Sequence, residues 1–481
     1  MMFKYVLGIN LLIAVLRIFY ILFYPIDLSP EEAQYWDWSR HLDLSYYSKP
    51  PMVAYINFLS TAILGNTEIG VRINAVILSF LLSLITYKFV KELYDEKTAF
   101  LSSVLPNILL GFSVNSILFT TDSPLIFFWA LSLVFLYKAV EENRLILWIL
   151  TGFFGGLAFL SKYSALFLLP LGFLYVFLVK RPLLKNIKVY ISLIVAFFIA
   201  LPVLIWNVEH NFISLRHVSS LANKNSSFPN IHAFLEFIGG QVLILSVIPF
   251  FFILYGWFKT FLSGDKREIF LTVFSFPIFV FFLVLSLKKR VYANWPDFGY
   301  YTGVILFSRY FLHSPVYLRV ATIFLGLFLT ILIHFTPLLD FMGIGKLLPP
   351  KNDPTKFLVG WEKLGKEVSK YYNKENFILS SAYQISAELA FYVKGNPRTY
   401  VYHINRYTQY YLWRKGLNKY KGKDALFVSY VGVPKGLMKS FAEKKFIKRV
   451  DIFWRGEKVR SFYIYLLKGF KGKLYENPEG Y

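Results

Sequence analysis

Long apolar segments separated by short polar turns make up the first two thirds of the chain. Stretches close to the ~20 apolar residues needed to cross a bilayer recur from Phe3 to about Phe335. Their repetition predicts a polytopic α-helical membrane protein rather than a few buried core helices. We predict about eleven spans, within a range of eleven to thirteen, at residues 3–23, 69–90, 98–118, 123–140, 145–160, 163–179, 187–206, 236–258, 268–287, 297–312 and 316–336. The first is too long for a signal-peptide core and lacks a small-residue cleavage site, so we predict an uncleaved span.

The pattern changes to that of a soluble protein at about Gly343. Helices are predicted near 361–373 and 385–393, and strands at 377–380, 399–402, 425–430 and 461–467. Strands that alternate with helices indicate a small α/β domain. We therefore predict a membrane domain at 1–336, with long outer loops at 24–68 and 207–235, and a soluble α/β domain at 337–481.

The composition supports this division and limits the chemistry. Of the 481 residues, 56% are hydrophobic and 17% charged, whereas soluble proteins carry about a quarter charged residues. The absence of cysteine excludes disulfides and thiolate metal sites. The seven histidines show no HxxH or HExxH pairing, so the sequence indicates neither a metal site nor a cofactor. It leaves open whether a divalent metal takes part.

Lysine and arginine in the short turns predict the orientation, because cytoplasmic turns carry an excess of both. The basic turns that fall on one side hold Lys88, Lys91 and Lys97; Lys138 and Arg144; Lys180, Arg181, Lys185 and Lys188; and Lys259, Lys266 and Arg267. Lys4 agrees with this side, which places the N-terminus in the cytoplasm. An odd number of spans then places everything after Thr336 outside.

The formal net charge of +23 points to membrane partners rather than to nucleic acid. Much of the charge is scattered after Asp340, which favours anionic lipid or a lipid-linked phosphate as partner and predicts no nucleic acid. One outer turn, Lys288-Lys289-Arg290, is basic on the side that should be poor in cations. Either the predicted spans are wrong at this point or the cations hold an anion. We favour the anion, with Lys289 and Arg290 as its ligands, because the flanking turns obey the rule.

The first outer loop contains a predicted helix with two adjacent glutamates. Ser29 is a good N-cap, Pro30 suits the first helical position, and Glu32 completes an S-x-x-E capping box. Because a lost capping box costs only about 1 kcal/mol, a Glu32→Gln variant is expected to stay largely active. Capping does not explain Glu31, which makes Glu31 a candidate functional residue with Tyr35 one turn later on the same face.

Two further outer positions are candidates for chemistry. Asp122 follows the third span and either caps the fourth or joins Glu31 in acid–base work. Lys49 precedes Pro50-Pro51, which fix its backbone beside the outer leaflet, so it is either a phosphate ligand or a snorkelling lysine. Lys162 has the same two interpretations, and Arg72 is interpreted as an interfacial anchor.

Several stretches in the same order resemble one protein family. They are Pro30–Ser39, Tyr46–Pro51, Thr120–Pro124, Gly156–Tyr163, Asn294–Pro296 and Ser381–Tyr392. Together they resemble the GT-C superfamily bacterial glycosyltransferases that modify lipid A with aminoarabinose or galacturonic acid, which are related to protein O-mannosyltransferases. Each stretch alone is a weak signal, but the ordered set covers most of the chain.

The resemblance implies a GT-C fold in the bacterial inner membrane and a periplasmic reaction. A sugar would pass from a polyprenyl-phosphate donor to lipid A or a related envelope glycolipid, with inversion at the anomeric carbon. The two acids of the family fall on Glu31 and Asp122, and its donor-phosphate lysine and tyrosines fall on Lys49, Tyr35 and Tyr46. The family usually has Asp where this chain has Glu31, and transfer rates are sensitive to ~1 Å of misplacement.

Two other functions remain as alternatives. A protein O-glycosyltransferase of the same fold would use serine or threonine hydroxyls as acceptors. A lipid-linked sugar flippase would place its charges at the membrane midplane and show repeat symmetry. The acids lie in outer loops, which favours transfer. The sequence does not specify the sugar, the acceptor or the oligomeric state.

Overall fold

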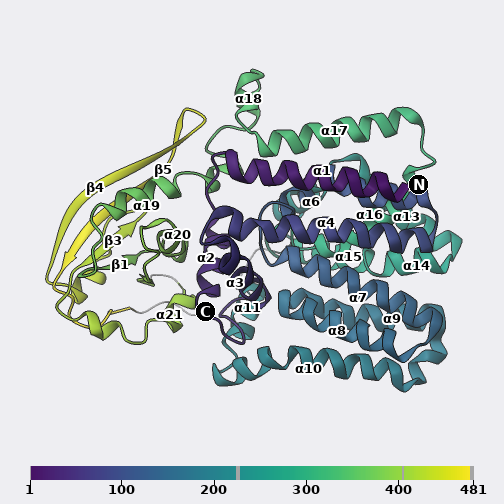
Figure 1. The fold of residues 1–481 in the computed structure, drawn as a ribbon, viewed down its shortest axis with the longest axis horizontal. Helices are drawn as coiled ribbons and strands as arrows, with labels where there is room; N and C mark the ends of the chain where they lie inside the picture. Colours follow the sequence, from purple (N-terminus) through teal and green to yellow (C-terminus); the bar gives the residue numbers. More distant parts are fainter. Residues whose placement is uncertain (1, 224–227, 404–405, 477–481) are drawn as a thin grey trace.

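A computed structural model describes residues 2–223, 228–403 and 406–476, in which a helix bundle and a sheet domain are joined end to end (Figure 1). In chain order the helices before residue 337 are α1 (Met2–Phe23), α2 (Pro30–Ser39), α3 (Met52–Leu64), α4 (Glu68–Leu93), α5 (Glu96–Val104), η1 (Leu105–Ile108), α6 (Leu110–Asn115), α7 (Asp122–Glu142), α8 (Leu145–Ser161), η2 (Tyr163–Phe167), α9 (Leu168–Lys180), η3 (Arg181–Lys185), α10 (Ile187–Glu209), α11 (Ile213–Asn223), α12 (Ile231–Ile244), α13 (Ile248–Ser263), α14 (Lys266–Val273), α15 (Phe276–Ser286), η4 (Asp297–Gly299), α16 (Tyr300–Phe311) and α17 (Val316–His334). The η elements are 3₁₀ turns. The N-terminus lies at the end of the bundle far from the sheet, and α2, α3 and α11 lie between the bundle and the sheet (Figure 1).

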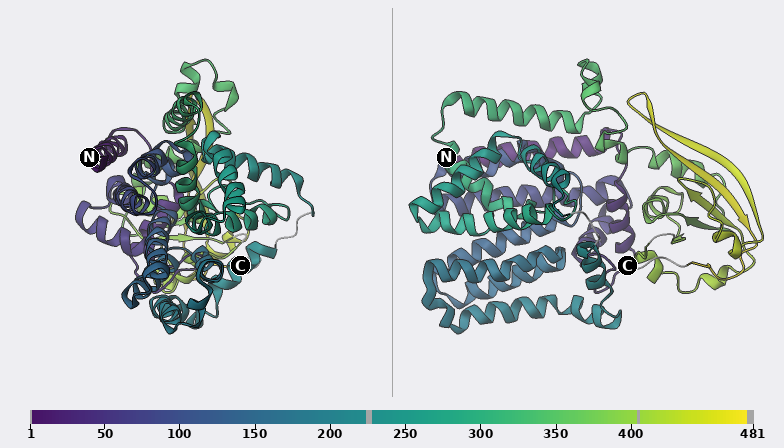
Figure 2. Two further views of the ribbon diagram at one scale, coloured as in Figure 1. Left: turned by 90° about the vertical axis from the view of Figure 1, so that its right-hand side faces the viewer. Right: turned by 180° about the vertical axis from the view of Figure 1, so that it is seen from behind.

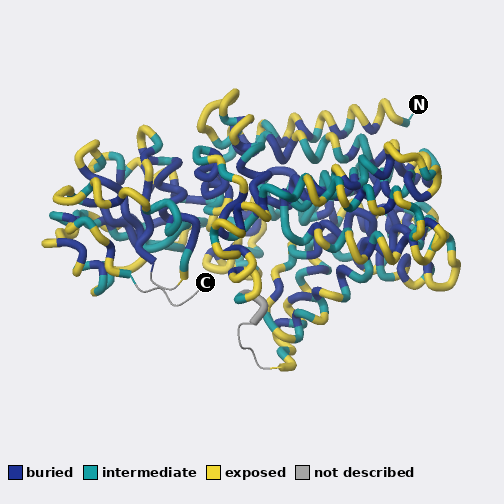
Figure 3. The backbone as a smooth tube through the Cα atoms, turned by 90° about the horizontal axis from the view of Figure 1, so that it is seen from below, coloured by how far each residue is buried: buried dark blue, intermediate teal, exposed yellow. Residues whose placement is uncertain are grey.

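The bundle has the length and composition of a polytopic membrane protein, as predicted. Within the described residues, seven helical segments are long and apolar enough to cross a membrane, or eight if α12 and α13, bent by 102° at their junction, form one span. Of the seven, α7 is the most buried and α17 the least, and Figure 3 shows exposed residues recurring along the outer helices. The remaining predicted spans fold as shorter or interrupted helices, so a count of eleven crossings stays a prediction.

The sheet domain has five strands in the order β2-β1-β3-β5-β4. β1 is parallel to both β2 and β3, and β5 is antiparallel to β3 and β4. Its elements are α18 (Leu338–Phe341), η5 (Gly345–Leu347), η6 (Pro354–Leu358), α19 (Trp361–Ser369), β1 (Phe377–Ser380), α20 (Tyr383–Tyr392), β2 (Thr399–Val401), α21 (Gln409–Leu412), η7 (Leu417–Tyr420), β3 (Ala425–Ser429), η8 (Leu437–Ser440), β4 (Glu443–Trp454) and β5 (Glu457–Lys468). The predicted α/β class and four strand positions are confirmed. β4 was missed because it is an edge strand with mostly exposed, charged residues, which hide the strand alternation.

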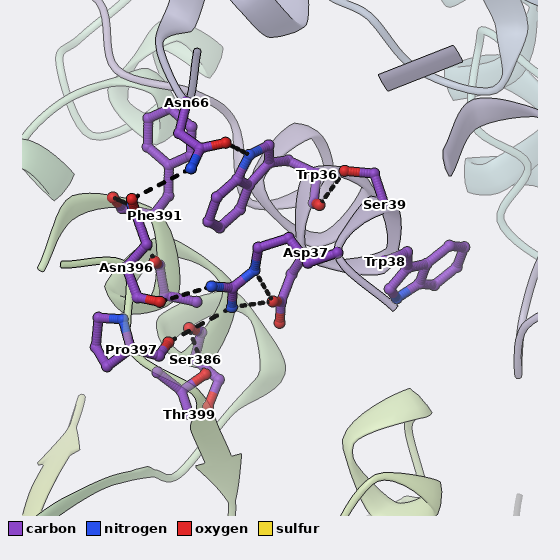
Figure 4. A network of polar contacts seen from close by, with 12 residues as sticks. Trp36, Asp37, Trp38, Ser39, Asn66, Ser386, Phe391, Asn396, Pro397 and Thr399 are labelled. Carbon is purple, nitrogen blue, oxygen red and sulfur yellow. Dashed lines mark hydrogen bonds and ion pairs between the residues drawn. The ribbon is translucent and has the colours of Figure 1, made fainter. Parts of the chain in front are cut away.

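Helix α2 is held against the sheet domain by a polar network (Figure 4). The Arg40 guanidinium donates to Asp37 Oδ1 (3.0 Å) in its own helix and to the Asn396 carbonyl (2.6 Å). The Tyr410 hydroxyl donates to Asp37 Oδ2 (2.8 Å). The Trp36 ring packs edge-on against Phe391 of α20 at 4.8 Å. These contacts leave α2 little freedom to move relative to the sheet.

The two adjacent glutamates of α2 have different environments. The predicted capping box is confirmed, because Ser29 N donates to Glu32 Oε2 (2.9 Å) and Glu32 N donates to Ser29 Oγ (3.3 Å). Glu32 also forms a fully buried ion pair with Arg72 Nε and Nη2, both at 3.0 Å. The interpretation of Arg72 as an interfacial anchor is therefore wrong: Arg72 lies in the protein core.

We expect a Glu32→Gln variant to lose much more stability than a capping box provides, contrary to the estimate from sequence. Removing one partner of a buried pair leaves the Arg72 charge uncompensated, which costs about 3–5 kcal/mol. Thermal unfolding of the purified protein in detergent measures the loss. In the control, Glu362→Gln removes an exposed pair with Lys366, worth less than about 1 kcal/mol. Equal midpoints for the two variants would show that the buried pair does not stabilise the fold.

Candidate active site

A cavity of about 1040 Å³ is lined by residues of both the helix bundle and the sheet domain. The lining elements meet where the two parts of the molecule join (Figure 2). We call this cavity the chamber. Its polar and charged lining includes Glu31, Gln34, Tyr35, Lys49, Asn115, Asp122, Lys162, His217, Asn294, Asp297, Tyr383, Gln384 and Arg406. The chamber thus brings together three of the residues predicted for the reaction, Glu31, Lys49 and Asp122, although they are far apart in the sequence.

Asp122 begins α7 and is buried in the chamber wall. Its Oδ1 accepts from Lys162 Nζ at 2.5 Å, and its Oδ2 accepts from Asn294 Nδ2 at 3.0 Å. Lys162 is the C-cap residue that follows α8, and its ion pair with Asp122 holds its ammonium group in the chamber wall. Both Asp122 oxygens are therefore held by side chains of other elements, which means that helix capping does not explain Asp122.

A third carboxyl group, Asp297, lies in the same wall and was not predicted. Asp297 begins η4, is buried, and accepts from Asn115 Nδ2 at 3.0 Å. The only signal in the sequence was its position directly after Asn294-Trp-Pro296. Because an isolated aspartate next to a proline is common at helix starts, the residue pattern alone did not distinguish it from a cap.

Glu31 occupies the first turn of α2 and extends into the chamber, where its surface is exposed although protein surrounds it. Burial raises the pKa of Glu31; Lys49 opposes this rise, and Asp122 adds to it. Burial lowers the pKa of Lys49, and the Lys162 charge lowers it further, while Glu31 and Asp122 raise it. Among the described residues Lys49 forms no ion pair. Glu31 and Lys49 therefore shift each other's pKa, and both remain available to a ligand.

The predicted tyrosines are in different places. Tyr35 lies on the face of α2 that lines the chamber, with its ring edge-on to Trp38 at 5.1 Å. Tyr46 is fully buried away from the chamber lining: its ring stacks on Trp38 at 4.4 Å, and its hydroxyl donates to the Trp38 and His41 carbonyls, both at 3.1 Å. Tyr46 thus fixes the loop before Lys49, and its predicted contact with the donor phosphate stays a prediction.

The basic turn before η4 does not reach the chamber lining. Arg290 pairs with Glu236 of α12 and is 65% exposed. Lys289 Nζ lies 5.4 Å from the ring centroid of Trp295. The Glu236 carboxylate therefore neutralises part of the positive charge of this turn. The predicted contact of Lys289 and Arg290 with a phosphate stays a prediction.

The chamber lining also includes a histidine and an arginine that lie outside the predicted set. His217 lies on α11, and Arg406 follows β2 in the sheet domain. The sequence offered no signal for Arg406 because the positive charges of that domain are scattered. Within the described parts of the chain, groups of three or more histidine or acidic residues arranged to hold a metal ion are absent.

Comparisons with known proteins agree with this architecture. Residues 48–206 match the family described as dolichyl-phosphate-mannose-protein mannosyltransferase. A solved structure of ArnT from Cupriavidus metallidurans bound to undecaprenyl phosphate is similar over 99% of both chains, with a TM-score of 0.68 and 12% identity. The chain has a GT-C glycosyltransferase fold. An oligosaccharyltransferase of Archaeoglobus fulgidus is similar over 82% of this chain and 64% of its own, with a TM-score of 0.50 and 15% identity.

Other known proteins are similar in sequence over part of their length. The lipid A galacturonosyltransferase RgtD of Rhizobium johnstonii is 31% identical over 282 residues, which are 58% of this chain and 60% of the relative. An undecaprenyl phosphate-alpha-4-amino-4-deoxy-L-arabinose arabinosyl transferase of Pseudomonas aeruginosa is 31% identical over 172 residues, 31% of each chain. The chain thus spans less than two thirds of the length of these relatives.

We expect Glu31 to remain protonated to higher pH than exposed glutamates, because burial favours the neutral carboxyl group. Labelling with dicyclohexylcarbodiimide, which reacts with protonated carboxyl groups, followed by peptide mass spectrometry, measures this. Lys49→Gln removes the cation that lowers the Glu31 pKa, so its labelling should persist to still higher pH. Labelling of Glu31 that stops at the same pH as at exposed sites, with no response to Lys49→Gln, would contradict the expectation.

Proposed function

We propose that the chain is a membrane glycosyltransferase that moves a sugar from a polyprenyl-phosphate donor to lipid A or a related envelope glycolipid, with inversion. One observation carries the proposal: Lys49, Glu31 and Asp122 line one chamber where an apolar bundle meets a soluble domain. The activities for which RgtD and the Pseudomonas aeruginosa relative are named, and the undecaprenyl phosphate in the ArnT structure, support this choice of donor and acceptor.

In the proposed reaction the charged groups of the chamber have different roles. The bond between the anomeric carbon and the donor phosphate breaks as the acceptor oxygen attacks, so the phosphate leaves as an anion that Lys49 stabilises. Glu31, whose side chain lines the chamber, takes the acceptor proton, and its raised pKa makes its carboxylate a stronger base than that of an exposed glutamate. Asp122, already bound to Lys162 and Asn294, orients the acceptor and stabilises the positive charge that develops on the sugar.

A second cavity suits the lipid tail of the donor. It measures about 480 Å³ and is lined mainly by apolar residues of α7, α8, α9 and α10. At one end its lining includes Phe159, Ala165 and Leu166, on both sides of Lys162 in the sequence. A prenyl chain in this cavity would hold its phosphate near the chamber while the tail stays in apolar surroundings.

The alternatives from the sequence have less support. RgtD is named for transfer to lipid A, whereas the matched family is one of protein mannosyltransferases, to which the chain is similar over residues 48–206 alone. A flippase needs its charges at the midplane of the bundle. The described acids of the chamber instead lie beside α2 and the sheet domain, which favours transfer to an acceptor that remains on one side.

We also propose that the protein lies in the bacterial inner membrane with its sheet domain in the periplasm. The basic turns support this orientation, since cytoplasmic turns carry the excess of lysine and arginine. So does the arrangement of the chain, in which the sheet domain lies at the opposite end of the bundle from the N-terminus (Figure 1). The chamber would then open on the periplasmic side.

Reporter fusions test the orientation. Alkaline phosphatase, which is active only in the periplasm, should be active when fused after Gly343 and inactive when fused after Tyr94, in the α4–α5 turn. A reporter that fluoresces only in the cytoplasm should show the reverse at the same two sites. Phosphatase activity at Tyr94 together with its absence at Gly343 would contradict the orientation but not the proposed reaction.

We expect Lys49→Gln to raise the KM for the donor by at least about tenfold, because a hydrogen bond to a charged group contributes about 1.5–3 kcal/mol. The assay follows transfer of radiolabelled sugar from polyprenyl phosphate to lipid A by the purified protein in detergent. The control, Lys394→Gln, removes an exposed lysine outside the chamber lining. A normal KM for Lys49→Gln in a folded sample would place the phosphate elsewhere, and absence of transfer by the unmodified protein would refute the proposed function.

A further inference from the structure

The sheet domain contributes a cation to the chamber wall that the proposed reaction does not use. Arg406 is exposed and lines the chamber, and its guanidinium carbon lies 5.9 Å from the ring centroid of Tyr383. Within the described residues Arg406 forms no ion pair with a carboxylate. A guanidinium presents several N–H donors in a planar fork, which matches carboxylate and phosphate oxygens. Arg406 is therefore free to bind an anion that enters the chamber.

A buried histidine faces the same space. His217 of α11 is 6% exposed, lines the chamber, and packs against the Tyr47 ring at 4.9 Å. Its Nδ1 is buried without a hydrogen-bond partner among the described residues. Burial, and then the charges of Arg406 and Lys49, lower the pKa of His217 to about 4. The ring is thus neutral near pH 7 and has one N–H to donate. A buried polar atom without a partner is costly, so the position of this ring is not explained by hydrogen bonds of its Nδ1 within the described protein.

Arg406 and Lys49 come from different parts of the chain: Lys49 from the loop before α3, and Arg406 from the sheet domain after β2. The charges that act most strongly on Lys49 are those of Lys162, Glu31 and Asp122. Arg406 acts on Tyr383 and, together with Lys49, on His217. Lys162 is already paired with Asp122. After a donor phosphate has bound at Lys49, Arg406 is therefore the remaining lysine or arginine of the described chamber lining that has no anion.

We propose that Arg406 and His217 form a second anion site in the chamber, separate from the lipid-phosphate site at Lys49. The site binds a carboxylate or phosphate group carried either by the transferred sugar or by the acceptor, and thereby selects substrates with two anionic groups. The inference rests on the proposed function for the identity of the substrates. The presence of an anion site does not depend on transfer, because binding alone reveals it.

Binding to the full-length protein in lipid nanodiscs, measured by native mass spectrometry, tests the site with two matched pairs of ligands. The first pair is a polyprenyl-phosphate uronic acid and the corresponding polyprenyl-phosphate hexose. The second is diphosphoryl lipid A and its dephosphorylated form. Arg406→Gln should weaken binding of the member with the additional charge in one pair by at least about tenfold, and change binding of its uncharged counterpart less than about twofold. The affected pair identifies the source of the anion.

Three further variants make the result specific. Arg406→Lys should restore part of the lost affinity because it keeps the charge but not the planar fork. His217→Phe, which keeps an aromatic ring and removes the donor, should weaken the same ligand. Arg449→Gln, which removes an exposed arginine paired with Asp451 on the sheet hairpin, should change neither pair.

The possible outcomes separate this inference from the proposed function. If the unmodified protein binds with the expected charge preference but transfers no sugar, the anion site is supported and the reaction is refuted. If transfer occurs but Arg406→Gln affects charged and uncharged members of each pair equally, or affects none of them, the second anion site is refuted and the reaction stands.

Discussion

The buried ion pair between Glu32 and Arg72 determines how the chamber is built. Besides the two Arg72 nitrogens, the Glu32 carboxylate accepts from the backbone amides of Ser29 and Phe119, and Arg72 donates to the carbonyls of Ile26 and Asp27. Burying two charges is costly unless hydrogen bonds satisfy them, and here several do. The Glu32 carboxylate thus connects the start of α2, the spanning helix α4 and the segment that leads to α7.

This connection places both proposed catalytic acids. Successive residues on an α-helix point about 100° apart, so fixing Glu32 toward the core directs Glu31 away from it and into the chamber. Phe119 lies three residues before Asp122, so the same carboxylate also holds the backbone that leads to the second acid. The geometry of the site therefore depends on a residue that contacts no substrate in the proposed reaction.

The sequence predicted the features that local patterns determine. Hydrophobic runs located the helices, and the capping rule distinguished Glu31 from Glu32. Features that depend on partners distant in the chain were missed. Arg72 was placed at the membrane interface because the residues around it do not indicate that Glu32, 40 residues away in the sequence, is its partner. Asp297, His217 and Arg406 were missed because only the fold brings them to one cavity. The comparisons support the fold and leave the roles of individual residues to experiment.

The sheet domain is part of the site rather than an appendage. Tyr47 N donates to Gln409 Oε1 at 2.7 Å, which attaches the loop that carries Lys49 to a segment of the sheet domain next to Arg406. The Asp37–Tyr410 hydrogen bond attaches the helix that carries Glu31 to the same segment. Separating the two parts would therefore disturb Lys49 and Glu31 as well as removing Arg406 from the chamber. A donor whose tail lies in the membrane reacts only if its headgroup contacts residues of both the helix bundle and the sheet domain. The contacts of Tyr47 and Asp37 hold these two parts together.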